Sequence, residues 1–155
     1  MSVQERYAPE NRCFGCGPAN AQGLRIRSFP TGGEGDELTA AWVASPHHEA
    51  FTGMLNGGIT GALLDCHSNW TAAWHLYNKT KATELPSTVT ADFHVTLKAP
   101  TPSRGPVHLS AKVVESTDRK AVIEAELSVD GQVTATCRGT FVAVRQGHPA
   151  YHRWQ

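Results

Sequence analysis

The chain has few cysteines, no net charge and no long hydrophobic run, and each of these absences excludes a class of protein. Four cysteines in 155 residues are too few and too irregularly spaced for a disulfide scaffold. Lysine plus arginine and aspartate plus glutamate both number 14, so no overall field attracts nucleic acid or an anionic membrane. No apolar run approaches ~18 residues, and the N-terminus lacks the charged-then-apolar pattern of a signal peptide. We therefore expect a cytoplasmic protein that binds neither nucleic acid nor membrane.

The chain shows no sign of division into separate domains. It has no internal repeat and no low-complexity linker, and its length suits one domain with a core of ordinary size. We expect a single domain over residues 1–155, in which residues 1–11 form an N-terminal arm and residues 146–155 a C-terminal tail.

The most regular pattern predicts one long helix. From Gly57 to about Tyr77, apolar residues recur at three- and four-residue steps, enough for roughly five to six turns. One face of this helix collects small and polar residues, namely Gly58, Gly61, Ala62, Asp65, Ser68, Asn69 and Ala72. Larger side chains lie mostly on the other face, namely Leu63, His67, Trp70 and Trp74. We expect a sheet to cover the larger side chains, which leaves Asp65 facing open space.

The rest of the chain is typical of β structure. Alternating apolar and polar residues predict strands over residues 24–29, 37–43, 88–98, 107–114, 121–129 and 132–144. Asp130-Gly131 is a strong hairpin signal, Thr31–Asp36 reads as a turn, and Pro46–Leu55 as a loop. The pattern predicts an α+β fold, in which five or six antiparallel strands carry one helix on a face of the sheet.

The start of the predicted helix, Asn56-Gly57-Gly58, offers the parts that acyl transfer needs. Glycines at a helix start let a ligand approach bare backbone N–H groups, and the helix dipole favours negative charge there. Asp65 stands alone in the apolar body of the same helix, where burying a carboxylate is costly. An oxyanion site and an acid/base or nucleophilic group would then share one helix. An aspartate on a solvated helix face is the simpler alternative.

Together with the strand pattern, this motif resembles the hotdog-fold acyl-CoA thioesterases, in particular the branch related to the phenylacetate-pathway enzymes. The resemblance covers about residues 11–145 in element order and spacing. It implies an antiparallel five- to six-stranded sheet wrapped around one long central helix. It also implies an acyl-CoA substrate, no metal, and no cofactor apart from the coenzyme A of the substrate. The chain departs from the family at Asn56, where the usual residue is His.

The resemblance also assigns roles to individual residues. Asp65 would act either as general base on water or as nucleophile on the acyl carbon, and both roles stay open. The N–H of Gly57, and less directly that of Gly58, would hold the oxyanion. Thr90, on the first strand after the helix, would help to position the water. Asn56 would orient the thioester or cap the helix, and a cap on Gly58 would also fix the oxyanion donor.

The spacing of these groups predicts two subunits. Asp65 lies eight residues beyond Gly57, or about 12 Å along a helix axis. A thioester carbonyl held at Gly57 is therefore out of reach of Asp65 on the same helix. We expect an isologous homodimer in which antiparallel helices build two equivalent sites. Similar thioesterases form dimers or tetramers made of two such dimers.

The phosphates of coenzyme A call for cations near the rim of a site. Four residues lie at strand ends and turns where similar proteins meet the nucleotide, namely Lys98, Arg104, Arg119 and Lys120. Each of these residues could equally be an exposed charged residue that binds no ligand.

Cys13 and Cys16 form a Cys-x-x-Cys motif, which by itself suggests a zinc site or a redox pair. A structural zinc requires four ligands, and no second close pair of Cys or His complements this one. A redox pair favours a helix start, whereas Gly17-Pro18 favours a turn. We interpret the pair as thiols that pack a glycine-rich turn near the sheet, with metal binding as the alternative.

Two other functions compete with thioester hydrolysis. Hotdog hydratases typically pair the aspartate with a histidine five residues later, and residue 70 here is Trp. A non-catalytic protein that binds acyl-CoA on the same fold is the alternative that remains, given Asn56.

Overall fold

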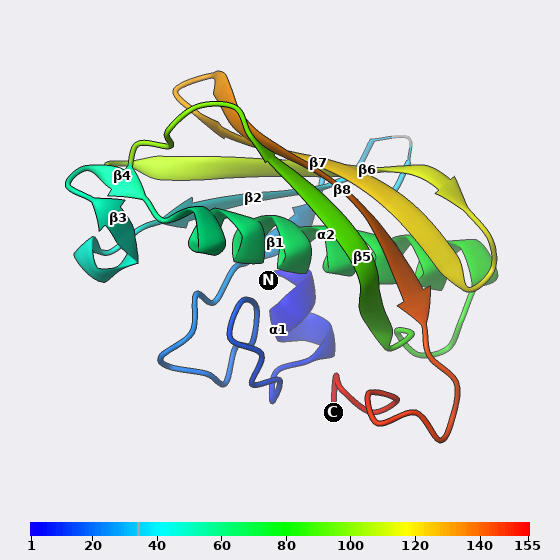
Figure 1. Cartoon of the computed structure of the whole chain (residues 1–155). Coiled ribbons are helices and arrows are strands. Elements are labelled where there is room, and N and C mark those ends of the chain that lie inside the picture. The colour runs from blue at the N-terminus through cyan, green and yellow to red at the C-terminus, as the bar shows by residue number, and fades with distance from the viewer. Residues whose placement is uncertain (34) are drawn as a thin grey trace.

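A six-stranded antiparallel sheet curves over one long helix in the computed structural model, which describes residues 1–33 and 35–155 (Figure 1). The elements are α1 (Val3–Tyr7), β1 (Ser28–Pro30), β2 (Leu38–Val43), a 3-10 turn (Pro46–His48), β3 (Glu49–Phe51), β4 (Met54–Leu55), α2 (Gly57–Thr80), β5 (Thr88–Leu97), β6 (Pro106–Ser116), β7 (Lys120–Val129) and β8 (Gln132–Ala143). The large sheet has the order β1-β2-β6-β7-β8-β5. The predicted α+β arrangement is confirmed.

Helix α2 begins and ends where its sequence supplies caps. The side chain of Asn56 accepts a hydrogen bond from the N–H of Ile59, and the predicted start at Gly57 is confirmed. The helix continues to Thr80, one turn beyond the predicted end at Tyr77. Lys81 then takes a left-handed conformation with φ 52°, which stops the helix.

The four strands after the helix agree with the predicted ones to within two residues. Between β7 and β8, Asp130 and Gly131 have φ angles of 50° and 80°. Two positive φ angles in a two-residue turn match the right-handed twist of the flanking strands, which explains why Asp-Gly occupies this position. The turn sets the β7–β8 register, in which Val129 pairs with Gln132.

The prediction was less accurate before the helix. The strand expected over residues 24–29 is displaced to Ser28–Pro30, because Arg25 is left-handed with φ 53° and interrupts the extended chain. The expected loop Pro46–Leu55 contains a 3-10 turn and the short β3–β4 hairpin. The predicted turn Thr31–Asp36 includes Glu34, which lies outside the described residues.

The expected orientation of α2 was right for His67, whose Nε2 lies 3.0 Å from the Leu38 carbonyl of β2, and wrong for the tryptophans. Two residues of its small-residue face, Ser68 and Ala72, are fully buried, whereas a Cβ atom added at Gly61 would meet no other residue within 4 Å. The tryptophans lie on the opposite face, where Trp70 packs against Trp154 with ring centroids 4.5 Å apart and Trp74 packs against Tyr7. Small residues let the helix approach the sheet closely. The two terminal segments lie on the side of α2 away from the sheet (Figure 1), where Tyr7 and Trp154 contact the two tryptophans.

The two ends of the chain are packed rather than free. Ser2 caps α1 through a capping box with Glu5, and the Gln4 side chain is buried against Ser28. At the other end, Trp154 is buried and its indole N–H donates to the carbonyl of Pro86 over 2.9 Å. Among the described residues, no helix has the length and apolarity that a membrane span requires.

Candidate active site

Asp65 and Thr90 meet between α2 and β5. The hydroxyl of Thr90 donates to Asp65 Oδ1 over 2.7 Å, and both side chains are partly buried. The pKa of Asp65 is raised chiefly by burial and also by the nearby Cys13, while the Thr90 hydrogen bond and Arg153 act in the opposite direction. The structure therefore places two of the predicted site residues, Asp65 and Thr90, in direct contact. The catalytic roles of both stay predictions.

A β-bulge explains how Thr90 reaches the helix side of β5. Thr90 pairs with Phe141 and Asp92 with Thr140, so Ala91 is an extra residue in the strand. Simple alternation would set Thr90 and Phe93 on opposite faces, but the extra residue reverses the alternation beyond it. Phe93 pairs with Gly139, and therefore shares the buried side of β8 with Phe141.

The strip beside Asp65 is apolar and open. Thr90, Phe93, Val95 and Leu97 follow one another along the helix side of β5, by the register of β5 with β8. Phe93 is 45% exposed and Leu97 57% exposed. Strand β5 is also ten residues long and forms an edge of the sheet. Long apolar edges of this kind are normally paired or covered in native proteins.

The start of α2 presents two backbone donors at the end of this strip. Asn56 Oδ1 accepts from the N–H of Ile59 over 3.1 Å, and the Asn56 carbonyl accepts from Thr60. Within the described residues, the N–H groups of Gly57 and Gly58 have no hydrogen-bond partner. The predicted cap on Gly58 is therefore wrong: the cap serves Ile59 and leaves both glycine donors available to a ligand.

The side chain of Leu97 lies close to the same turn. A Cβ atom added at Gly57 would stand 3.1 Å from Leu97 Cδ1, so a larger residue there would press on this side chain. The end of β5 and the start of α2 are thus adjacent, with the exposed Leu97 side chain beside the turn that carries the two backbone N–H groups.

The four predicted phosphate-binding cations divide between the two ends of α2. Lys98 directly follows β5, near Gly57, and Arg104 lies in the β5–β6 connection. Arg119 and Lys120 lie at the β6–β7 turn, beside the other end of the helix, where Lys79 donates to Ser116. One helix of 24 residues separates these ends by roughly 35 Å. Arg119 also donates to the carbonyl of Ala143 over 2.6 Å, which occupies part of its guanidinium.

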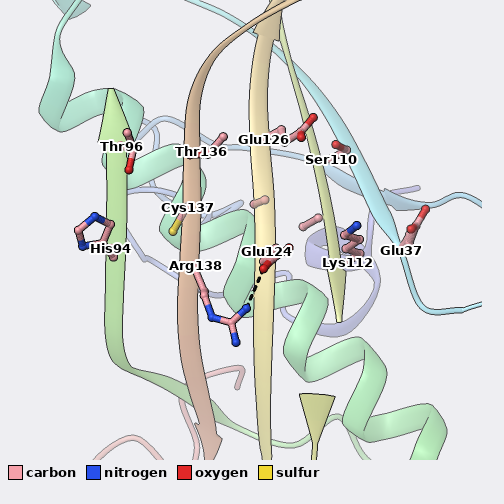
Figure 2. Close-up of a pocket in the computed structure, with 12 residues that line it drawn as sticks. Glu37, His94, Thr96, Ser110, Lys112, Glu124, Glu126, Thr136, Cys137 and Arg138 are labelled. Atoms are coloured by element: carbon pink, nitrogen blue, oxygen red, sulfur yellow. Dashed lines mark hydrogen bonds and ion pairs between the residues drawn. The ribbon is translucent and has the colours of Figure 1, made fainter. Parts of the chain in front are cut away.

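A depression of about 360 Å³ lies elsewhere, on the face of the sheet that turns away from α2 (Figure 2). It contains charged side chains, including an ion pair between Arg138 and Glu124 at 2.7 Å. Asp65 and Thr90 do not line it. The candidate site therefore lies apart from this depression.

Sequence reasoning missed a hydrogen-bonded chain of Asp36, His75 and Ser116. His75 Nδ1 lies 2.8 Å from Asp36 Oδ2, and His75 Nε2 lies 2.8 Å from Ser116 Oγ. Lys79 Nζ lies 3.1 Å from the same hydroxyl. An acid, a base and a hydroxyl in this order also occur in serine hydrolases. These residues come from three distant parts of the sequence, so no local spacing indicates the cluster.

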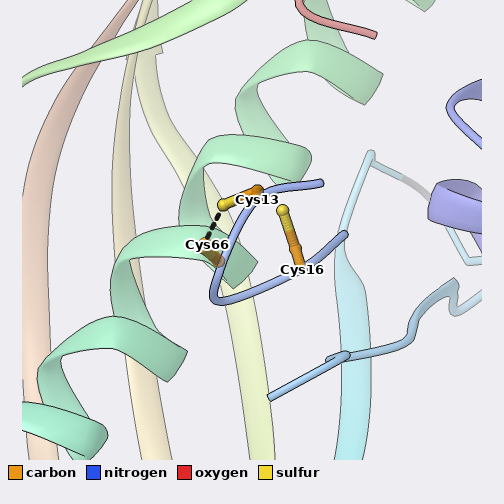
Figure 3. Close-up of side chains that lie close together, drawn as sticks. All are labelled: Cys13, Cys16 and Cys66. Atoms are coloured by element: carbon orange, nitrogen blue, oxygen red, sulfur yellow. Dashed lines mark hydrogen bonds between the residues drawn. The ribbon is translucent and has the colours of Figure 1, made fainter. Parts of the chain in front are cut away.

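The Cys13–Cys16 turn packs on the outer face of α2, and the expectation that it lies near the sheet was wrong. Cys66 of the helix joins the two turn residues, and the three Sγ atoms lie within 4.8 Å of one another (Figure 3). Leu24 and Ile26, predicted to be in a strand, donate their N–H groups to the carbonyls of Phe14 and Gly15 and hold this turn in place.

Comparisons with known proteins identify the fold. A thioesterase superfamily protein matches with a TM-score of 0.70 and 22% identity, over 85% of this chain and 63% of that one. A second thioesterase superfamily protein, from Shewanella loihica, matches with a TM-score of 0.64 and 26% identity, over 83% and 98%. A phenylacetic acid degradation-related protein from Ralstonia eutropha matches with a TM-score of 0.67 and 22% identity, over 83% and 92%.

These matches confirm that the chain has the hotdog fold found in thioesterase superfamily proteins. The chain spans less than two thirds of the first of these structures. Neither a scan with protein-family models nor a search of curated proteins finds a match.

Proposed function

We propose that the protein is an acyl-CoA thioesterase, which hydrolyses a thioester to a carboxylic acid and free coenzyme A. The observation that carries the proposal is the contact between Asp65 and Thr90 beside an open apolar strip. A carboxylate that is partly buried next to a hydroxyl can hold and deprotonate a water molecule. The apolar strip of β5 suits an acyl chain.

The proposed reaction uses the carboxylate of Asp65 and the backbone N–H groups of Gly57 and Gly58. Asp65 accepts a proton from water while the hydroxide adds to the thioester carbon. The oxyanion that forms accepts hydrogen bonds from the free N–H groups of Gly57 and Gly58. Collapse of this intermediate expels the thiolate of coenzyme A, which takes up a proton. In the alternative course, Asp65 attacks the acyl carbon itself and water then cleaves the resulting anhydride.

The site requires two protomers. Eight residues separate Gly57 from Asp65, or about 12 Å along α2, so both groups of one helix do not reach one carbonyl. We propose that a second copy packs against the exposed edge of β5 and the first half of α2. Asp65 of one protomer would then face Gly57 of its partner. This pairing would also cover Phe93 and Leu97.

The test is a thiol-release assay on a panel of acyl-CoAs that range from short to long and from aliphatic to aromatic. Asp65→Asn should lower kcat by 10²–10⁴-fold, a typical loss on removal of a general base. The fold should survive, because the Asn oxygen can still accept the Thr90 hydroxyl. Thr90→Val should lower the rate only moderately. The matched control is Asp92→Asn, an exposed carboxylate on the same strand, which should leave turnover unchanged.

Two further outcomes separate the competing functions. Turnover within a few fold of the wild type in Asp65→Asn, together with its loss in Ser116→Ala, would move the chemistry to the Asp36–His75–Ser116 chain. Binding of acyl-CoA without thiol release by the wild type would establish the non-catalytic alternative.

A further inference from the structure

Three cysteines from two distant parts of the chain converge on the side of α2 that faces away from the sheet. Cys13 Sγ and Cys66 Sγ are 3.8 Å apart, and the Sγ atom of Cys16 lies within 4.8 Å of both (Figure 3). A metal ion with bonds of about 2.3 Å to sulfur holds its sulfur ligands about 4 Å apart. The three thiols therefore stand near the spacing of metal ligands before any ion binds.

The turn around Cys13 supplies hydrogen-bond donors to sulfur. The thiols of Cys16 and Cys66 and the backbone N–H groups of Cys16 and Gly15 lower the pKa of Cys13, although burial opposes this effect. Asn11 Nδ2 lies 3.7 Å from Cys16 Sγ, and Asn11 Oδ1 accepts from the N–H of Cys13. Donors of this kind orient thiolate ligands and stabilise their charge at metal sites.

A buried donor without a partner points to the same cluster. Trp70 is fully buried, and its indole N–H has no hydrogen-bond partner among the described residues. A buried N–H in this state costs free energy and calls for an explanation. Cys13 raises the pKa of Cys16 most strongly, and the indole N–H of Trp70 lowers it. A thiolate ligand at Cys16 would give this N–H an acceptor.

We propose that Cys13, Cys16 and Cys66 bind one Cu(I) ion through three sulfur ligands. Soft thiolates select soft metal ions such as Cu(I). Structural zinc takes four ligands, and in the part of the chain that the structure describes no fourth Cys, His, Asp or Glu joins this group. Asp65, the chain neighbour of Cys66, turns instead to Thr90.

The site would fasten the N-terminal turn to α2. Residue 15 must be glycine for the turn to come this close, because a Cβ atom there would collide with Cys66 Sγ. A bound ion would add a second link between the turn and the helix, one residue from Asp65. This inference does not depend on thioester hydrolysis, since neither Asp65 nor Thr90 belongs to the thiol cluster.

The test is anaerobic titration of the reduced full-length chain with Cu(I), in competition with a coloured Cu(I) chelator. We expect one Cu(I) per chain, and an affinity at least 100-fold lower in Cys13→Ser, Cys16→Ser and Cys66→Ser. Trp70→Phe, which removes the indole donor and keeps an aromatic ring, should weaken binding by about 10–100-fold. Cys137→Ser is the matched control, because Cys137 is a buried cysteine of β8 outside the cluster.

A measurement on the unaltered chain guards against variants that do not fold. Cu(I) should protect the partly exposed Cys13 from alkylation, as read by mass spectrometry, and X-ray absorption should count three sulfur ligands. An affinity that falls equally in Cys137→Ser would overturn the proposal. So would two sulfur ligands, tighter binding of Zn(II) than of Cu(I), or unchanged alkylation of Cys13.

Discussion

Protonation of His67 should destabilise the protein in mildly acidic solution. His67 is fully buried between α2 and the β1–β2 edge of the sheet. Its Nε2 lies 3.0 Å from the carbonyl of Leu38, so the proton must be on Nε2, and its Nδ1 accepts the hydroxyl of Ser28. Ser28 Oγ already accepts a hydrogen bond from Gln4. A second ring proton would therefore disrupt a satisfied network.

The size of the effect follows from the pKa. Burial lowers the pKa of His67 from 6.5 to about 4, and the hydrogen bond to Leu38 only partly opposes this. Between these two values the unfolded chain binds more protons than the folded chain, so stability falls as the pH falls. The loss is absent above pH 6.5, reaches about 2 kcal/mol at pH 5, and levels off at about 3 kcal/mol below pH 4, at 1.36 kcal/mol per unit.

Urea unfolding at several pH values between 7.5 and 5 measures this loss, with the protein concentration held fixed. We expect the wild type to lose about 2 kcal/mol more than His67→Gln over this range, which corresponds to roughly 1 M urea in the midpoint. Gln can still donate to Leu38 but does not titrate. His108→Gln, at an exposed position on β6, serves as the control and should behave as the wild type. Equal losses in the wild type and His67→Gln would refute the reasoning.

Three further predictions test the cap, the interface and the C-terminal segment. Asn56→Ala should cost about 1 kcal/mol of unfolding free energy, and Asn56→Ser should restore it; if both variants also lose kcat or gain KM, the amide orients the substrate as well. Phe93→Lys should leave the protomer folded but abolish the dimer in light scattering, and a monomeric wild type that hydrolyses acyl-CoA would contradict the two-protomer site. Trp154→Ala should cost about 3 kcal/mol in thermal unfolding, as expected for truncation of a buried tryptophan that packs on Trp70; a change below 1 kcal/mol would show that the tail is not fastened.

The sequence by itself determined the elements whose signals are local. The apolar steps from Gly57 onward predicted α2, and Asn56 predicted its cap, because both depend on neighbours within one turn. Asp130-Gly131 predicted the β7–β8 hairpin, because few residues tolerate two positive φ angles. The resemblance to thioesterases then directed attention to Asp65 and Thr90, which the structure brings into contact.

Only the tertiary structure decided which surfaces meet. Helix α2 has two faces that can be buried. The positions of its residues around the helix do not predict that the terminal segments, rather than the sheet, cover Trp70 and Trp74. The bulge at Ala91 depends on the partner strand β8, so strict alternation misplaced Thr90 relative to Phe93. Cys66 lies 53 residues from Cys13 in the sequence, and no spacing rule connects them. Contacts between distant segments arise when each buries the surface that the other leaves exposed, and this depends on the whole fold.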